Sequence, residues 1–191
     1  GGKIIVEDFP EKIQLKQKGY QVFFKNKTRR YEKVMGALGR VPNISKLKIE
    51  NAKIKLNLKG AIHTDDLFKT SVKNIYAIGD VIDKVQLTPV AISEAMTFVN
   101  NLKSNNKKKF NYKNIPTAVF SNPNYAFVGC SENEAKKIYK KIKVYKSQFR
   151  SLKFSMSNSK EKVLIKLITN ALNDKIVGLH YAGENAAEII Q

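Results

Sequence analysis

The chain has 191 residues, of which 42% are hydrophobic, so it can fill a core and is not a disordered segment. Its 35 lysines and arginines against 16 acidic residues give a formal net charge of +19, spread through every segment. That spread favours a solvated basic surface over a nucleic-acid reader, in which arginines or aromatic residues gather on one element. Because no apolar run approaches the ~18 residues of a membrane span and no signal peptide is visible, we expect a cytoplasmic protein without membrane contact.

Residues 1–42 have the pattern of short strands separated by turns. Apolar or alternating stretches predict strands over residues 3–6, 12–15, 20–24 and 31–39. The last of these ends at Gly39, followed by Arg40. A glycine at a strand end allows close approach of a ligand and an arginine can pair with phosphate, although a turn glycine beside a surface arginine explains the same residues.

The segment TSVKNIYAIGDVIDKVQLTP (residues 70–89) is the stretch around which the chain is organised. An apolar run, Ile75–Ile78, predicts a buried strand that ends at Gly79 and Asp80. A carboxylate beside a residue without a side chain is suited to a ribose or polyol hydroxyl, and open α/β sheets bind ligands at this end of their strands. Thr88 is expected to cap an amphipathic helix over residues 88–103, whose free N–H groups favour an anionic or carbonyl-rich ligand.

From residue 115 the pattern changes to antiparallel strands with short helices, an α+β arrangement. Strands are predicted over 117–120, 125–129, 143–149, 163–168 and 176–181, and helices over 132–141 and 184–191. Ser131 and Glu134 form the spacing of a capping box at the first of these helices. The only cysteine, Cys130, excludes an internal disulfide and is expected to be structural; with two distant histidines, no metal site is expected.

Five motifs, in order, resemble the pyridine nucleotide–disulfide oxidoreductases, the flavoenzyme family of glutathione reductase and dihydrolipoamide dehydrogenase. They are AxGRxPN (37–43), TSVxNIYAIGDV (70–81), LTPVAI (87–92), IPTAVFSNP (115–123) and VGCSENEA (128–135). The segments QFRSLKFSMS (148–157) and AAEIIQ (186–191) look most like the glutathione reductase branch. The resemblance implies three parts: the end of an NADPH-binding α/β domain (1–42), a central FAD-contacting domain (43–113) and an α+β antiparallel-sheet dimerisation domain (114–191).

The resemblance also implies roles for individual residues. Asp80, beside Gly79, would bind the ribityl chain of FAD, and Thr88 would offer its backbone N–H to the flavin ring. Gly39 would lie against NADPH, while Gln86 and Ala118 would touch its nicotinamide end through their backbones. The protein would form a homodimer. Four more residues would lie near the disulfide substrate of the neighbouring subunit: Phe149, Arg150, Leu152 and Lys153.

The sequence also departs from the family pattern, and these departures predict what the chain cannot do by itself. The redox-active cysteine pair, the FAD phosphate loop and the His-Glu segment of the family are not among these residues, so we expect a C-terminal fragment with no catalytic residue and no activity by itself. The parent enzyme would pass electrons from NADPH through FAD and an active-site dithiol to glutathione disulfide. Where glutathione reductases often carry Gly-Arg, this chain has Ala95 and Met96.

Two other functions remain open from the sequence. One is dihydrolipoamide dehydrogenase, which would use NAD instead of NADPH. The other is a non-catalytic basic module that binds nucleic acid or assembles through its β-sheet, which a salt-sensitive DNA shift without flavin binding would favour.

Overall fold

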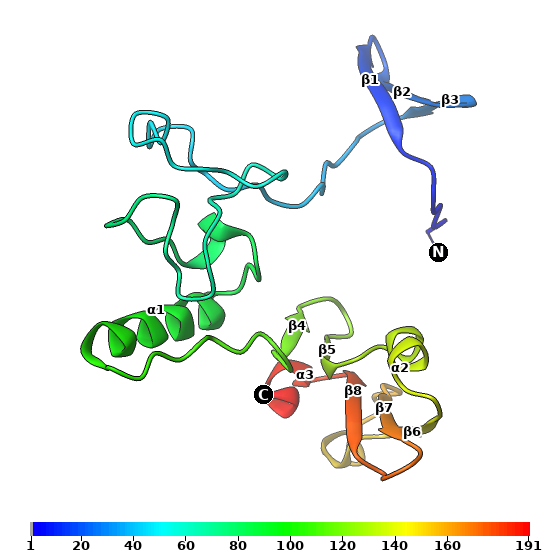
Figure 1. Ribbon diagram of the computed structural model, residues 1–191. Helices are drawn as coiled ribbons and strands as arrows, with labels where there is room; N and C mark the ends of the chain where they lie inside the picture. The colour runs from blue at the N-terminus through cyan, green and yellow to red at the C-terminus, as the bar shows by residue number, and fades with distance from the viewer. Residues whose placement is uncertain (1) are drawn as a thin grey trace. The chain divides into compact units, whose positions relative to one another are not determined.

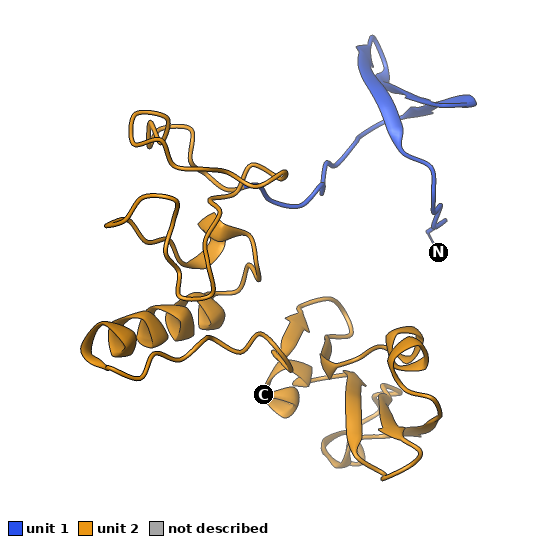
Figure 2. Cartoon of the chain, in the orientation of Figure 1, with its two compact units in different colours: residues 1–41 blue, residues 42–191 orange. Residues whose placement is uncertain are grey.

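The computed structural model describes residues 2–191. The chain divides into two compact units, with the boundary between residues 41 and 42 (Figure 2). The first unit is an antiparallel meander of three strands in the order β1-β2-β3: β1 Pro10–Lys16, β2 Gly19–Phe24 and β3 Lys27–Tyr31. Val22, on the central strand, is its buried residue, paired with Ile13 and Arg29. At the β1–β2 turn, Gly19 has a φ of +89°, and a Cβ there would lie 2.4 Å from the carbonyl oxygen of Tyr31.

Two strands expected in this unit are absent from it. Residues 3–6 pair with no strand, and of residues 31–39 only Tyr31 belongs to one, β3. The apolar residues that produced these expectations, such as Ile4 and Leu38, stand exposed. An extended segment becomes a strand only when its N–H and C=O groups have a ladder partner, and these segments have none within residues 2–41.

The first part of the second unit, residues 42–113, is mostly loops around one long helix (Figure 1). It contains the 3₁₀ turn η1, Gly79–Ile82, and the helix α1, Thr88–Lys103. The helix was expected from the apolar periodicity. The expected strand over residues 75–78 is reduced to one bridge between Tyr76 and Lys69, and a second isolated bridge joins Ile62 to Leu56. Both are extended segments that are too short to build a ladder.

A small apolar core holds these loops together. Ile62, Phe68, Ala77 and Ile82 are buried against one another, and Phe98 of α1 packs on them. The N–H of Ala77 donates a hydrogen bond of 3.0 Å to the carbonyl of Phe68, which fixes the segment that leads into η1. The core therefore places the end of the Ile75–Ile78 segment beside α1.

The second part is a five-stranded antiparallel sheet in the order β4-β5-β8-β7-β6, so the predicted α+β architecture is confirmed. Its elements are β4 Thr117–Val119, β5 Tyr125–Gly129, α2 Glu132–Ile138, β6 Ile142–Phe149, η2 Leu152–Phe154, β7 Val163–Asn170, β8 Ile176–Ala182 and α3 Ala186–Ile190. The expected strands and helices agree with these elements to within a few residues. The short helix α3 packs on β4, β5 and β8.

The core of this sheet is made by residues from distant parts of the sequence. Ala126 of β5, Val163 of β7 and Tyr181 of β8 are buried with Ala186 and Ile190 of α3. Burial of this apolar surface is the main favourable contribution to its folding. Within residues 2–191, no helix is long and apolar enough to cross a bilayer.

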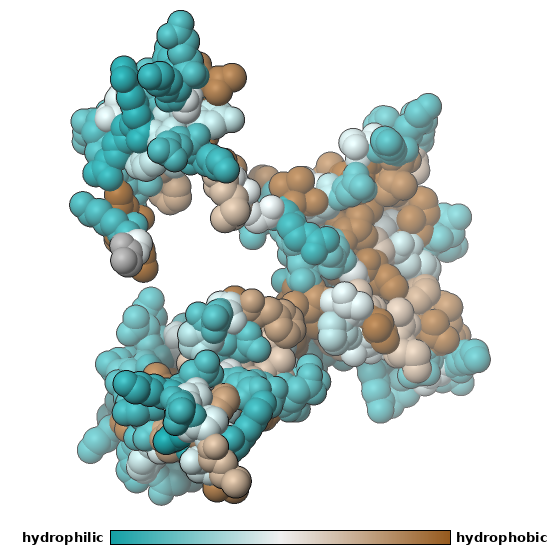
Figure 3. Space-filling view, turned by 180° about the vertical axis from the view of Figure 1, so that it is seen from behind, coloured by the Kyte–Doolittle hydropathy of each residue, from teal (hydrophilic) through white to brown (hydrophobic). Residues whose placement is uncertain are grey.

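Hydrophobic side chains also reach the surface, as the patches among hydrophilic residues in Figure 3 show. On α1, Ile92, Met96 and Val99 are exposed at spacings of four and three residues, so they share one face of the helix. Phe98 of the same helix points into the core.

Candidate functional site

The turn at Gly79 and Asp80 is packed directly on α1. Gly79 is buried with a φ of +73°, a conformation that residues with a Cβ rarely adopt. A Cβ at this position would also lie 3.2 Å from the Cβ of Ala91. Glycine is therefore required here, and it brings the backbone that carries Asp80 against the second turn of the helix. The Asp80 side chain is half-buried.

The helix α1 starts at Thr88 itself, one residue before the start expected with Thr88 as the N-cap. Leu87 is the N-cap residue, and its carbonyl accepts hydrogen bonds from the N–H groups of Val90 and Ala91 at 3.0 Å. Thr88 is the first helical residue and makes no side-chain cap, so its expected role as N-cap is wrong. Thr88 and Pro89 are both exposed, so the positive end of the helix dipole is accessible.

A buried carboxylate joins the turn to the helix. Glu94 of α1 is only 1% exposed, and its Oε2 accepts the N–H of Gly79 at 2.5 Å. Its Oε1 accepts the hydroxyl of Tyr112 at 2.6 Å. We did not predict this residue from the sequence, although a signal was present: Glu94 falls in the helical spacing of the apolar residues Val90, Ala91 and Phe98.

Tyr112 closes the other side of this arrangement. Burial raises its pKa well above the ordinary value, and the hydrogen bond to Glu94 raises it further, because both favour the neutral phenol. The Lys84 ammonium lies 5.1 Å from the centre of the Tyr112 ring, a cation–π contact. The segment after α1 is thus fixed to the helix beside the Gly79 turn.

A surface cleft of about 630 Å³ lies at the start of α1. Leu87, Pro89, Ala118, Phe120 and Gln191 are among the residues that line it. Ala118, expected at the nicotinamide end of NADPH, therefore shares a cleft with the beginning of the helix. The cleft is mostly apolar in its lining, which suits a flat organic ring.

The other residues predicted for a site lie elsewhere. Gln86 donates from Nε2 to Oδ1 of Asp83 at 2.6 Å, close to the helix start. Gly39 belongs to the unit of residues 1–41, in an irregular segment where it has a φ of +88° and open space around its Cβ position. That position also leaves its backbone open to a ligand.

The segment after β6 forms a separate cluster. Phe149 ends β6 with its ring partly exposed, and Leu152 is exposed in η2. The guanidinium of Arg150 donates to the carbonyls of Phe154 and Ser157, which fold the loop back on itself. The Lys153 ammonium pairs with Glu184, just after β8. None of these residues lines the cleft at α1.

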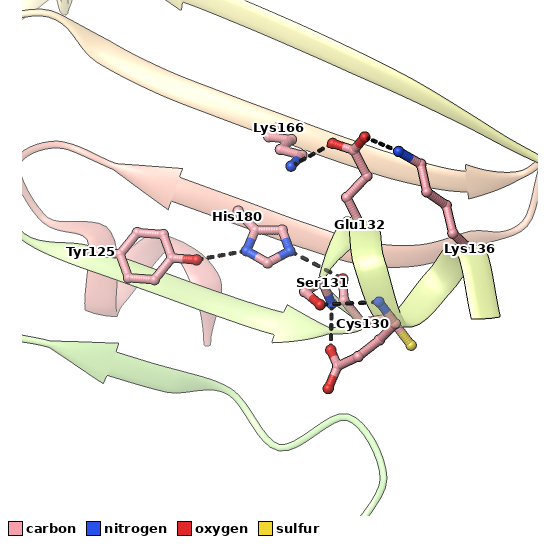
Figure 4. Close-up of polar contacts among 8 residues, drawn as sticks. Tyr125, Cys130, Ser131, Glu132, Lys136, Lys166 and His180 are labelled. Atoms are coloured by element: carbon pink, nitrogen blue, oxygen red, sulfur yellow. Dashed lines mark hydrogen bonds and ion pairs between the residues drawn. The ribbon is translucent and has the colours of Figure 1, made fainter. Parts of the chain in front are cut away.

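An ion pair attaches α2 to the sheet: Lys166 of β7 pairs with Glu132, the first residue of α2, at 2.8 Å (Figure 4). The figure also shows two polar contacts of His180. Tyr125 is 2.7 Å from Nδ1 of His180, and Nε2 of His180 is 3.1 Å from the carbonyl oxygen of Cys130. Because a carbonyl only accepts, Nε2 carries the hydrogen and Nδ1 accepts the Tyr125 hydroxyl in the neutral ring. This histidine therefore has a structural explanation, as Cys130 does beside it.

The family of the chain follows from comparison with known proteins. Residues 3–95 match the pyridine nucleotide-disulphide oxidoreductase family, and residues 115–191 match the dimerisation domain of the same family. The chain belongs to this family, whose members use a flavin and a pyridine nucleotide. The predicted family and fold are thereby confirmed.

Among curated proteins, the chain is similar to glutathione reductases and trypanothione reductases. The chain is 42% identical over 158 residues to a glutathione reductase of Burkholderia cepacia, covering 83% of this chain and 35% of that protein. It is 38% identical over 194 residues to a trypanothione reductase of Trypanosoma congolense, covering 100% of this chain and 39% of that protein. The chain spans about a third of the length of these curated relatives.

A solved structure shares the fold. The HOCl-induced flavoprotein disulfide reductase RclA from Escherichia coli is similar with a TM-score of 0.84 and 25% identity. That comparison covers 97% of this chain and 43% of RclA.

Proposed function

We propose that this chain is part of an FAD- and NADPH-dependent disulfide reductase whose substrate is glutathione disulfide. The observation that carries the proposal is the Gly79–Asp80 turn packed against α1, in a chain that matches this family on both sides of the helix. The bound cofactors would supply the electron transfer. The chain itself would bind, orient and shield them.

The residues at the turn fit a flavin nucleotide. A half-buried carboxylate can accept hydrogen bonds from the polyol hydroxyls of FAD, and Asp80 would take that role next to Gly79, whose lack of a side chain lets the turn pack on α1. The exposed start of α1 at Thr88 presents N–H groups and a positive dipole end to the carbonyl edge of the ring. The backbones of Gln86 and Ala118 would contact the nicotinamide of NADPH, and Gly39 would lie against the same cofactor.

Residues 114–191 would make a homodimer, because they correspond to the dimerisation domain of the family. In that dimer Phe149, Arg150, Leu152 and Lys153 would lie near the disulfide substrate of the neighbouring subunit. Residues 1–42 and 43–113 would then be the end of the NADPH-binding domain and the central domain.

The experiment uses the full-length enzyme that carries this chain, purified with its flavin. We expect a flavin absorbance spectrum and oxidation of NADPH on addition of glutathione disulfide. Asp80→Ala should reduce the flavin content of the purified protein. Turnover of NAD with dihydrolipoamide instead would assign the enzyme to the dihydrolipoamide dehydrogenases. The 191-residue chain has one cysteine and no dithiol, so we expect it to show no turnover by itself.

A second candidate substrate is trypanothione disulfide. Two observations favour it: Met96 stands where the glutathione reductases often have arginine, and trypanothione reductases of Trypanosoma congolense and Leishmania donovani are 38% and 40% identical to this chain. A higher kcat/KM for trypanothione disulfide than for glutathione disulfide would assign this substrate.

A further inference from the structure

We propose that Glu94 is a positioning residue, which holds the Gly79–Asp80 turn against α1 and so sets where Asp80 stands relative to the start of the helix. The inference rests on the proposed function, because its consequence is read through flavin binding. Glu94 does not itself reach a ligand, since it is 1% exposed.

The two oxygens of Glu94 have separate tasks. Oε2 accepts the N–H of Gly79 at 2.5 Å, and Oε1 accepts the hydroxyl of Tyr112 at 2.6 Å. A buried carboxylate is costly unless such donors surround it, and here one donor comes from before α1 and the other from after it. The side chain thus ties two loop segments to one point on the helix.

The consequence for Asp80 follows from the chain. Gly79 precedes Asp80 directly, and its backbone is pressed on Ala91 with a φ of +73°. Without the Glu94 acceptor, the Gly79 N–H would be buried without a hydrogen-bond partner, which is unfavourable. The turn would relieve this cost by moving away from α1, and Asp80 would move with it. Displacements of about 1 Å are enough to weaken a preorganised site.

The same helix offers a matched control. Asn101 is buried in α1 and makes two hydrogen bonds to Lys108, one from Nδ2 to the carbonyl and one from the Lys108 N–H to Oδ1, each of 2.8 Å. Like Glu94, it is a buried residue of α1 with two side-chain hydrogen bonds to loop residues. Its partner lies in that segment alone, and none of these bonds involves Gly79 or Asp80.

The test compares the FAD dissociation constants of the apoenzymes, measured by quenching of flavin fluorescence, with melting temperatures recorded in parallel. Glu94→Ala should raise the dissociation constant about tenfold or more, the equivalent of one lost hydrogen bond. Glu94→Gln should stay within about threefold of wild type, because its amide can accept from Gly79 and donate to the Tyr112 oxygen. Asn101→Ala should lower the melting temperature and leave the dissociation constant unchanged.

Each result decides the matter. A Glu94→Ala apoenzyme that binds FAD as wild type does, or an Asn101→Ala effect on binding of the same size, would overturn the positioning role. If Glu94→Ala does not fold, Glu94→Asp replaces it: the shorter side chain keeps the charge but cannot reach both donors, so weaker FAD binding is again expected and unchanged binding overturns the role. A wild-type enzyme that binds no FAD would overturn the proposed function as well, whereas normal wild-type binding with unaffected variants overturns only this inference.

Discussion

Gly129 of β5 and Gly178 of β8 are partners across the ladder, and neither has room for a side chain. A Cβ on Gly178 would lie 2.1 Å from the carbonyl oxygen of Cys130. A Cβ on Gly129, which has a φ of +77°, would lie 2.4 Å from the carbonyl oxygen of Val177. This close approach permits the 2.8 Å hydrogen bond from the Cys130 N–H to Val177 just before α2.

Gly178→Ala should therefore destabilise the sheet by about 1–3 kcal/mol, the usual cost of forcing extra volume into a filled site. The free energy of unfolding from denaturant titration measures this. Gly36→Ala is the control, since Gly36 has open space around its Cβ position and, like Gly178, no positive φ, so it should lose little stability. Equal losses for the two variants would contradict the crowding argument.

The elements of residues 115–191 were predictable because local signals and tertiary packing agree there. The capping box at Ser131, the turn before Ile176 and the alternation along β6 each mark a boundary that the sheet preserves. Residues 1–42 and 60–78 were predicted less well, because apolar runs indicate extended backbone but not whether another strand lies beside it. Leu38, exposed after β3, illustrates this limit.

The capping box at α2 gives the second prediction. The Glu134 N–H donates to the Ser131 hydroxyl at 3.3 Å, and the Ser131 N–H donates to Glu134 at 2.8 Å. Ser131→Ala removes the first bond and should cost about 1 kcal/mol of unfolding free energy. Ser93→Ala, an exposed position inside α1, should cost nothing, because alanine is the better helix former. A loss at Ser93 as large as that at Ser131 would show that the cap is not the cause.

Glu132 gives a prediction about acid stability. It pairs with Lys136 and Lys166, each at 2.8 Å, and the hydrogen bonds from Lys136 and then Lys166 lower its pKa from 4.5 to about 2. A depressed folded-state pKa contributes stability above the unfolded value, which is lost as the pH falls toward about 2. The difference in unfolding free energy between wild type and Glu132→Gln should shrink over this range.

Asp174→Asn provides the comparison for Glu132. Asp174 makes a single pair with Lys143 at 2.8 Å, and its φ of 53° is one that asparagine tolerates well. We expect a smaller effect from this variant at neutral pH. A Glu132→Gln difference that does not change with pH would rule out the carboxylate as the titrating group.

The parts of the candidate site that carry a sequence motif were predictable. The parts that depend on tertiary contacts, such as those of Glu94, were not. The sequence patterns predicted that the chain turns at Asp80 and that a helix starts near Thr88, whereas the binding roles of these residues and of Ala118 stay predictions. Glu94 did not follow, because helical spacing places it on the inner face but does not show which N–H it accepts. Its partner Tyr112 lies 18 residues away in a polar segment without a periodic pattern.

Tyr112 yields a spectroscopic prediction. Since burial and Glu94 raise its pKa above the ordinary 10.0, its stabilising contribution is present below pH 10 and is lost as the pH rises through the folded-state value. In an ultraviolet titration of phenolate absorbance, Tyr112→Phe should lack the component that ionises at the highest pH. In Glu94→Gln the component should shift to lower pH. Burial also raises the pKa of Tyr181, so the comparison is between variants; identical curves for wild type and Tyr112→Phe would contradict it.

Met96 lends itself to a change of substrate preference in the full-length enzyme. It is 59% exposed on α1 and lies on the same helix face as Ile92, so an arginine can be accommodated without burying its charge. Glutathione disulfide carries carboxylates that a guanidinium can bind in a two-pronged contact. Met96→Arg should therefore raise kcat/KM for glutathione disulfide about tenfold, the size of one charge-assisted hydrogen bond. Met96→Leu keeps the volume without the charge and should leave kcat/KM unchanged; an equal gain from leucine, or none from arginine, would place the substrate away from this face of the helix.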